Sequence, residues 1–341
     1  MLRNLHLLRV VAALGVVYFH ATSSAGLNLA WDVGSRGVDV FFVISGFIIA
    51  HIGLSKPEHF IQRRLIRVVP FYWAATLVVF LAATIAPRFF RSTDASLPHL
   101  VASLFFIPHT SMTGEMQPTV ILGWSLNFEM YFYVLFALAL QVSRRWSPLI
   151  CSTWIVLWVL AINSMEVTNP IAAFVARPTV LEFCFGIAAY YLFNWCESRR
   201  TLLSQQTPLK WLLIVVLAAS AVALVVLEKY YRGVVPRHLV AGIPAFFLVT
   251  SALLLERVFG IVSHSRLIYL LGESSYVIYL IHPYVVFATL RIGLHDPTSL
   301  SLPFMALLIV GLLAITSALS LAIHLYLEKP VMAFLRAKLL D

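Results

Sequence analysis

Long apolar blocks recur along almost the whole of this 341-residue chain. Most of them are about 17–25 residues long, which is the length that an α-helix needs to cross the hydrocarbon core of a bilayer. Hydrophobic residues make up 61% of the sequence and charged residues only 11%, whereas soluble proteins contain about 45–50% and about 25%. The sequence therefore predicts an all-α integral membrane protein.

The blocks predict a bundle of about ten transmembrane helices. We expect spans at residues 6–25, 37–54, 70–87, 97–108, 122–141, 147–164, 171–193, 209–227, 239–258 and 268–290, with 301–327 as an eleventh candidate. The block at 97–108 is the shortest, and a re-entrant or interfacial segment there brings the count back to ten. No soluble domain fits between or after these blocks, so residues 1–341 are expected to form one membrane-embedded domain.

The distribution of lysine and arginine predicts the orientation. With the N-terminus in the cytoplasm, 16 of the 24 basic residues fall on the inner side. Lys229, Arg232 and Arg237, which share one outer loop, are the chief exception. The bias predicts a multi-pass protein of the inner (cytoplasmic) membrane with both termini cytoplasmic. The net charge of +9 then faces membrane lipids and anionic ligands, because no basic domain exists to bind nucleic acid.

Motifs for several common kinds of site are missing. Cys151, Cys184 and Cys196 lie in or beside apolar blocks and have neither metal-ligand nor disulfide spacing. The sequence contains no Walker loop, dinucleotide fingerprint, zinc-protease helix or G-x-S-x-G elbow. We therefore expect no metal site, and no serine or cysteine stands out as a nucleophile.

Arg9 and His20 lie eleven residues apart in the first apolar block, LLRVVAALGVVYFH. At about 100° per residue, two such side chains face the same way to within about 20° and lie about 16 Å apart along the helix axis. Ionisable groups in a membrane span are costly and usually face a cavity or a partner. The first helix is therefore expected to contribute to a site.

Three arginines, Arg63, Arg64 and Arg67, follow the second block in FIQRRLIRVVPFYW, and Pro70 is expected to start the third span. Arg64 and Arg67 share a face if this stretch is helical. A positively charged inner loop is the simplest interpretation. The same side chains also suit a phosphate-rich ligand held by bidentate hydrogen bonds.

Glu129 lies in WSLNFEMYFY, about 7.5 Å along the predicted helix from Trp124, an aromatic residue suited to the membrane interface. An unpaired carboxylate at that depth is costly, so it needs a partner. His20, at a similar outer depth, is the natural candidate, because a carboxylate bonded to one imidazole nitrogen makes the other a stronger base. A structural Glu–His or Glu–Arg pair is the alternative.

Other polar residues inside the blocks belong either to the same site or to helix packing. Asp39 suits the N-terminus of the second helix, and Gly46 suits a close helix contact. Ser274 is expected to make an interhelical hydrogen bond, and YLEKP, with Glu328 and Pro330, reads as a helix stop. The further candidates for the site are Asp39, Ser45, Arg177, Glu182, Ser275, Tyr276 and His282.

The chain resembles the acyltransferase-3 family of integral-membrane acyltransferases in six segments that occur in the same order: LRVVAALGVVYFH, GVDVFFVISGF, FIQRRLIRVVP, WSLNFEMYFY, LGESSYVIYLIHP and YLEKP. The resemblance covers nearly the whole chain, and the combination is more specific than any one segment. Members of the family acylate sugars of exopolysaccharides, lipopolysaccharides and similar glycans. The resemblance, closest to the stand-alone members, implies a ten-helix bundle with acyl-CoA, most often acetyl-CoA, as donor.

The resemblance also implies roles for individual residues. The family's arginine–histidine pair falls on Arg9 and His20, its R-x-x-R on Arg64 and Arg67, and the glutamate of its W-S-L-x-x-E on Glu129. In the family, the histidine is thought to be catalytic and the arginine pair is linked to donor use. Two features depart from the pattern. Arg63 adds a third arginine that could bind the donor, and the basic loop at 228–238 has no counterpart.

These residues suit transfer of an acyl group from acyl-CoA to a hydroxyl of a glycan or lipid-linked saccharide. His20 would accept the hydroxyl proton with support from Glu129, a role worth about 10²–10⁴-fold in rate. Arg64 and Arg67 would hold the CoA phosphates at the inner face, and Arg9 would line the path of the pantetheine arm. A transporter or flippase of a lipid-linked glycan is the alternative, because such proteins also need buried ionisable residues.

Overall fold

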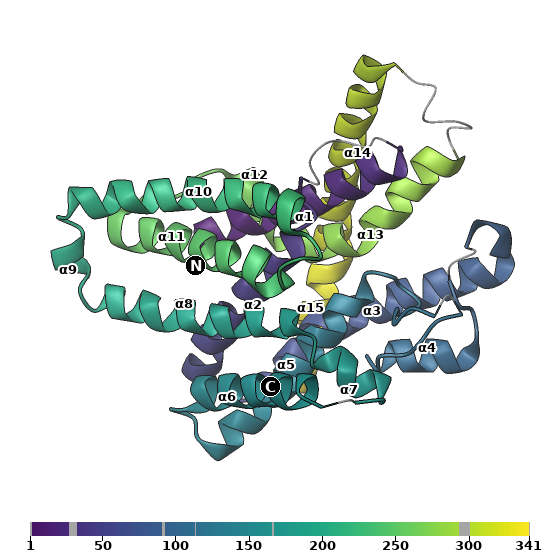
Figure 1. The fold of residues 1–341 in the computed structure, drawn as a ribbon. Coiled ribbons are helices and arrows are strands. Elements are labelled where there is room, and N and C mark those ends of the chain that lie inside the picture. The colour runs from purple at the N-terminus through teal and green to yellow at the C-terminus, as the bar shows by residue number, and fades with distance from the viewer. Residues whose placement is uncertain are drawn as a thin grey trace. The chain divides into compact units, whose positions relative to one another are not determined.

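The computed structural model describes residues 2–26, 33–90, 93–112, 114–165, 167–292 and 301–340. Within these ranges the chain is helical between its turns and loops, and it contains one isolated β-bridge, between Thr110 and Met116, but no strand (Figure 1). The predicted all-α fold is confirmed. The helices group into two compact units, one formed by Met1–Ile48 with Glu182–Leu327 and the other by Ile49–Leu181 with Glu328–Asp341.

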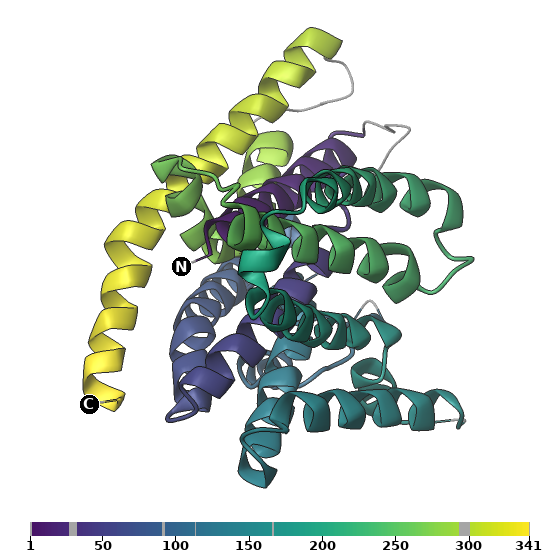
Figure 2. The ribbon, with the colours of Figure 1, turned by 90° about the vertical axis from the view of Figure 1, so that its left-hand side faces the viewer.

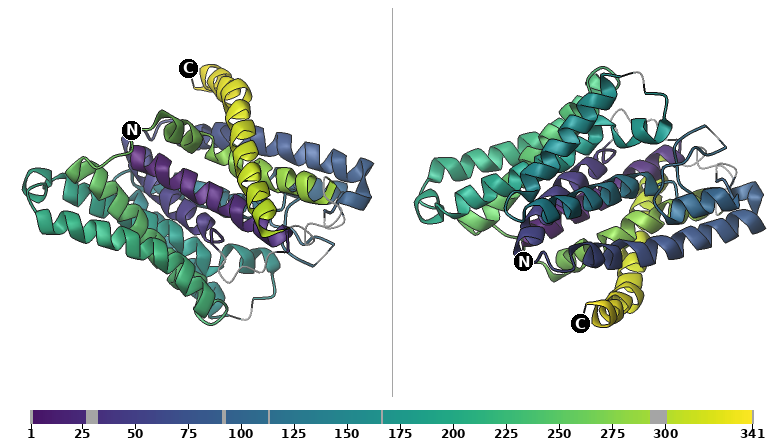
Figure 3. Two further views of the ribbon diagram at one scale, coloured as in Figure 1. Left: turned by 90° about the horizontal axis from the view of Figure 1, so that it is seen from above. Right: turned by 90° about the horizontal axis from the view of Figure 1, so that it is seen from below.

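The first unit is built around α1. Its helices are α1 (Arg3–Ser24), the first half of α2 (Gly37–Ser55), α8 (Leu181–Glu197), α9 (Arg200–Leu203), α10 (Thr207–Tyr231), η3 (His238–Gly242), α11 (Ile243–Phe259), α12 (Arg266–Glu273), α13 (Ser275–Phe287), η4 (Ala288–Ile292), α14 (Leu302–Ile323) and η6 (His324–Glu328). Helix α1 contacts α11, α12, α13 and α14, and α10 runs beside α11 (Figures 1 and 3). Buried apolar residues such as Leu8, Val43 and Val249 form a shared core of this unit.

The second unit contains the rest of α2, α3 (Phe60–Ile85), η1 (Pro87–Phe89), α4 (Leu97–Leu104), α5 (Gly123–Val142), α6 (Ser147–Asn163), α7 (Pro170–Val175), η2 (Pro178–Val180) and α15 (Lys329–Leu339). Helix α3 packs against α4, α5 and α15. Aromatic side chains fill the interior: Tyr72, Phe128 and Phe136 are fully buried, and the Phe128 and Phe174 rings stack with centroids 4.6 Å apart. The bulky rings of α5 thus hold this helix against α3 and α7.

Eight helices of the described residues are long and apolar enough to cross a membrane, and a bent pair, Arg266–Glu273 with Ser275–Leu290, makes a ninth if it counts as one span. Helix α6 is a shorter apolar helix of 17 residues. Exposed apolar side chains cover α10, for example Val215 and Val222, as expected of a helix that faces lipid. These features fit a multi-pass membrane protein.

The block at 97–108 contains only the eight residues of α4. At about 1.5 Å per residue, such a helix is about 12 Å long and cannot cross the hydrocarbon core. The structure therefore agrees with the interpretation that this block, the shortest of those predicted, is not a full span.

The predicted bounds of two spans, 70–87 and 171–193, are wrong near a proline. Helix α3 begins at Phe60 and carries Pro70 inside it, which membrane helices tolerate because neighbouring groups satisfy the freed carbonyl. The predicted span at 171–193 is interrupted at Arg177, which precedes Pro178 and has extended backbone angles, as expected of a residue before proline.

The expected helix stop at YLEKP is also wrong. The chain continues as a short π-helix, η6, and then as α15, with Pro330 in the first turn of α15, a position where proline is favoured. Figure 2 shows α14 running on into α15. The predicted eleventh block therefore extends to Leu339.

Helices α2 and α8 approach closely at two glycines, as expected for Gly46. A Cβ on Gly46 would overlap the carbonyl oxygen of Phe183, and one on Gly186 would overlap that of Val43. We expect Gly46→Val to destabilise the fold by about 1–3 kcal/mol or more, because the backbones must separate. Thermal unfolding in detergent measures this, with Gly311→Val as the control, because a Cβ on Gly311 has no neighbour within 4 Å. Equal melting temperatures for the two variants would contradict this packing.

Candidate functional site

His20 lies in the last turns of α1, four residues before the helix ends at Ser24. Its half-buried ring lies 5.2 Å from the ring of His282 on α13, centroid to centroid, with 40° between the ring planes. Arg9 lies on the same helix and is also half-buried. The structure thus gives His20 a second histidine as a neighbour, at a position that the sequence left open.

His282 is fully buried, and its own helix fixes its ring. The ring nitrogen Nδ1 lies 3.1 Å from the carbonyl oxygen of Ile278, and a carbonyl accepts only, so Nδ1 carries the proton and donates it. The other nitrogen, Nε2, then has a lone pair, and it has no hydrogen-bond partner among the described residues. In its neutral form, His282 therefore presents Nε2 as an oriented acceptor beside His20.

Arginines gather in the second unit around Arg64. This side chain interacts electrostatically with Arg67 of its own helix, with Glu129 and Tyr133 of α5, and with Arg336 of α15. The charged groups that act on Arg64 are thus two further arginines and one carboxylate, which leaves an excess of positive charge. We name Arg64, Arg67, Glu129, Tyr133 and Arg336 the arginine cluster.

Glu129 belongs to this cluster through two kinds of contact. The Tyr133 hydroxyl, one helical turn away, donates a hydrogen bond to its Oε1, and the charge of Arg64 acts on it. Trp124 lies in the first turn of α5, with its ring 6.0 Å from that of Phe128. We expected either a histidine or an arginine as the partner of Glu129. Among the described contacts within this unit, the partner is an arginine, Arg64.

Sequence reasoning missed Arg336. The predicted helix stop at YLEKP placed this residue in a tail, whereas α15 packs against α3 and brings the Arg336 charge to Arg64. The signal for this helix was present in the amphipathic segment that follows Pro330. Proline is favoured in the first turn of a helix, so it can mark a helix start.

Buried ionic pairs surround the start of α2 in the first unit. Asp39 is fully buried, and both its oxygens accept hydrogen bonds of 2.8 Å from Arg237. Burial lowers the pKa of Arg237, but Asp39 outweighs that effect and raises it above the ordinary value. Glu182 is fully buried next to this pair, and neither of its oxygens has a hydrogen-bond partner among the described residues. Two of the candidate residues, Asp39 and Glu182, are thus neighbours.

Arg36 and Arg232 share one carboxylate close by. Arg36 donates to Oε2 of Glu228 through Nε, at 2.6 Å, and through Nη2. The Nε of Arg232 lies 3.5 Å from Oε1 of the same carboxylate. The basic loop that opposes the predicted charge bias is therefore held by buried acids.

The remaining candidates occupy separate positions. Arg177 is in the second unit, where its guanidinium lies 4.7 Å from the centre of the Phe174 ring and burial lowers its pKa. Ser275 donates to the carbonyl of Gly272. The prediction that Ser274 makes an interhelical hydrogen bond is wrong. Its hydroxyl donates to the carbonyl oxygen of Leu271, three residues earlier, at the break between α12 and α13. The side chains of Arg63, Ser45 and Tyr276 are half-buried.

No group of three or more histidine, cysteine, aspartate or glutamate side chains could hold a metal ion in the part of the chain that the structure describes. The ionisable candidates that the two units contain include imidazole, carboxylate and guanidinium groups. An imidazole with a neutral acceptor beside it suits proton transfer, and clustered guanidinium groups suit phosphates.

Comparison with known proteins identifies the chain's relatives. The profile of a family described as an acyltransferase domain matches residues 2–323. The exopolysaccharide production protein ExoZ of Rhizobium meliloti (strain 1021) is 33% identical over 328 residues, which cover 94% of this chain and 96% of ExoZ. No solved structure matches the chain.

Two further relatives match over shorter stretches. Nodulation protein 10 of Rhizobium leguminosarum bv. viciae is 27% identical over 216 residues, which cover 54% of this chain and 59% of that protein. A Staphylococcus aureus (strain COL) protein named as a proposed O-acetyltransferase is 28% identical over 188 residues, which cover 46% of this chain and 29% of that protein. Five of the six segments that suggested the resemblance, all but YLEKP, lie within the residues that the family profile matches.

Proposed function

Because the chain belongs to the acyltransferase-3 family of membrane acyltransferases, we propose that it transfers an acyl group, most simply acetyl, from acyl-CoA to a hydroxyl of a glycan or lipid-linked saccharide. The observation that carries this proposal is the half-buried imidazole of His20 beside the neutral acceptor His282. Proton transfer is the chemistry that such an imidazole offers.

In the proposed reaction His20 acts as the general base. The hydroxyl oxygen of the sugar attacks the thioester carbonyl, and its proton passes to His20. The new C–O bond forms as the C–S bond breaks, and the proton moves from His20 to the departing sulfur, so that the products are an ester and CoA. Glu129 is the carboxylate proposed to stabilise the imidazolium, and His282 is proposed to accept the second N–H of His20 and so to hold its tautomer.

The arginine cluster is the proposed donor site. CoA carries three phosphate groups, and guanidinium groups bind phosphate oxygens in bidentate fashion. The cluster already holds more positive than negative charge, so an incoming phosphate would relieve repulsion among its arginines. Arg9 and Arg63 are proposed as further contacts to the donor.

The proposed setting is the inner membrane, with both termini cytoplasmic and about ten spans. The excess of basic residues on one side supports that orientation. It places the donor arginines on the side where acyl-CoA is made, and His20 nearer the other side. The thioester would then have to enter the helix bundle to meet the acceptor.

An in vivo acylation assay tests the function. In a Rhizobium meliloti strain lacking ExoZ, the chain is expected to raise the content of ester-linked acyl groups in the exopolysaccharide above that with an empty vector. Proton NMR before and after mild alkali measures these groups, and a strain with the His20→Ala variant serves as the control. Equal acyl content in all three strains, with the protein detected in the membrane fraction, would contradict the proposal.

A further inference from the structure

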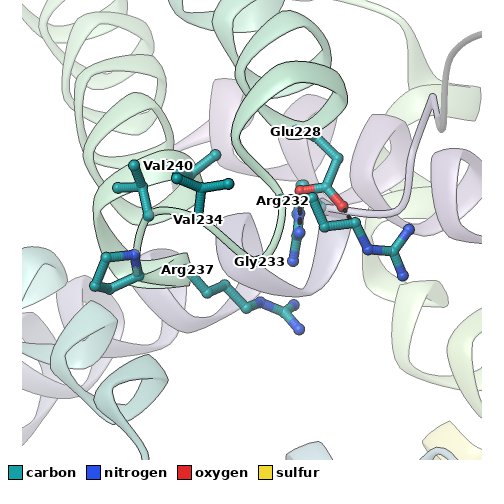
Figure 4. A pocket seen from close by; sticks show the side chains of 9 residues that line it. Glu228, Arg232, Gly233, Val234, Arg237 and Val240 are labelled. Atoms are coloured by element: carbon teal, nitrogen blue, oxygen red, sulfur yellow. Dashed lines mark hydrogen bonds and ion pairs between the residues drawn. The ribbon is translucent and has the colours of Figure 1, made fainter.

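A cavity of about 420 Å³ opens at the end of α10 in the first unit. Its walls are Arg36, Glu228, Val240 and residues 232–237, the loop between α10 and η3 (Figure 4). This volume falls within the range of small-molecule sites, about 300–1,000 Å³. Three of the lining side chains are arginines and one is acidic. The lining therefore carries an excess of positive charge.

The excess lies at the mouth of the cavity. Glu228 is almost completely buried, with 3% of its side chain exposed, whereas the side chain of Arg232 is 64% exposed. Arg36 holds the same carboxylate at 2.6 Å, closer than the 3.5 Å of Arg232. One carboxylate cannot neutralise two guanidinium groups, and each guanidinium has five N–H donors. An anion entering the cavity could bind Arg232 while Glu228 keeps Arg36.

The rear wall is fixed by the ionic network behind it. Arg237 is held by both oxygens of the buried Asp39, and a bidentate pair of this kind sets the orientation of the guanidinium plane. Gly233 has a φ of +77°, a conformation that favours glycine and lets the loop turn back towards Arg237. Val234 and Pro236 add apolar surface beside the arginines. The cavity thus combines an oriented guanidinium group with apolar contact, as expected of a small-molecule site.

The wall of the cavity is connected to α1 through the segment that precedes α2. Residue Arg36 follows Gly34, which makes close backbone contact with Gly15 of α1, and precedes Gly37, which contacts Ala12. His20 is five residues beyond Gly15, about 7.5 Å further along the helix axis. The segment that carries Arg36 into the cavity wall therefore packs against α1, the helix that also carries His20.

We propose that this cavity binds an anionic group, a carboxylate or a phosphate, of the acceptor saccharide. The inference rests on the proposed function, because it takes the acceptor to be a glycan. It also assigns a role to Arg232 and Arg237, two of the three basic residues that oppose the charge bias of the sequence. The anion can be an acidic sugar of the glycan or the phosphate that joins a saccharide to its lipid carrier.

Binding of small sugars to the purified full-length chain tests the proposal. The probes are glucuronate for the acidic sugar, glucose 1-phosphate for the phosphate linkage, and glucose as the neutral control, each followed by NMR saturation transfer. We expect one charged probe to bind and glucose not to bind. The variant Arg232→Gln loses a charged hydrogen bond, so it is expected to bind that probe about 10- to 100-fold more weakly. The tighter of the two charged probes identifies the source of the anion.

The control variant is Lys229→Gln, which removes one positive charge from the same segment without touching the cavity lining. It is expected to bind the probe like the wild type. Equal weakening in both variants, or no binding of either charged probe, would overturn the proposal, and so would displacement of the probe by acetyl-CoA. Acetyl-CoA binding, measured on the same samples, separates failure of the acceptor-cavity proposal from failure of the proposed function. If it persists while the probes fail, only the acceptor cavity is wrong, whereas its absence counts against the proposed function itself.

Discussion

Replacing His20 with alanine is expected to lower acyl transfer by about 10²–10⁴-fold, because the sugar hydroxyl then loses its proton acceptor. Binding of acetyl-CoA is expected to stay within about twofold of the wild type, since the proposed donor contacts come from arginines and not from this imidazole. The measurement is CoA release by the purified protein, with the acceptor polysaccharide in excess. Full activity of the variant would contradict the role of His20 as the base.

Two companion variants separate catalysis from positioning. Glu129→Gln is expected to lower kcat strongly and to leave KM for the donor nearly unchanged if Glu129 stabilises the imidazolium. A rise in KM would instead assign Glu129 to a structural pair with Arg64. His282→Gln is expected to cost less than His20→Ala and to change the pH profile of kcat, because it alters the group that holds the His20 tautomer. An unchanged profile would exclude that contact.

The double variant Arg64→Ala with Arg67→Ala is expected to weaken acetyl-CoA binding by about 10²-fold or more, since each charged hydrogen bond contributes about 1.5–3 kcal/mol. Both residues belong to the arginine cluster on α3. Isothermal calorimetry in detergent measures the Kd. Arg336→Ala is expected to weaken binding in the same direction by a smaller factor.

The matched control removes the same charge elsewhere in the second unit. Lys56 and Lys338 are both exposed, so Lys56→Ala with Lys338→Ala lowers the net charge by two without altering the cluster. Its Kd is expected to remain within about twofold of the wild type, because exposed charges at a distance are screened by salt. If both double variants weakened binding alike, the effect would be one of general charge, and the arginines would return to a topological role.

The sequence was sufficient to predict the all-helical membrane architecture, because long apolar blocks have one stable solution in lipid. It also placed His20 and Glu129 on helices that the structure contains, whereas Arg64, expected before the third span, lies inside α3. It failed at Pro70, Pro178 and Pro330, where the same residue lies inside a helix, in a break and in a first turn. Local rules for proline cannot distinguish these cases, since neighbouring helices decide which backbone groups are satisfied.

The contacts within each unit were harder to predict than the helices. Nothing in the spacing of His20 and His282, or of Asp39 and Arg237, relates residues that are some 200 or more positions apart. Their pairing depends on which helices pack together, and helix packing in a membrane is driven by van der Waals contact and small residues. Gly46 is the exception, because a glycine in an apolar helix does indicate where another helix comes close.

The most direct measurement of the central claim is transfer of labelled acetyl from acetyl-CoA by the purified protein. Deacylated exopolysaccharide serves as acceptor, and free CoA and polysaccharide-bound label are counted in the same reaction. The account predicts one CoA released for each acetyl group bound, with label removed by mild alkali and transfer by His20→Ala lowered by about 10²–10⁴-fold. Folded protein that neither binds acetyl-CoA nor releases CoA, and that instead moves a lipid-linked saccharide across proteoliposomes, would contradict it and identify a transporter.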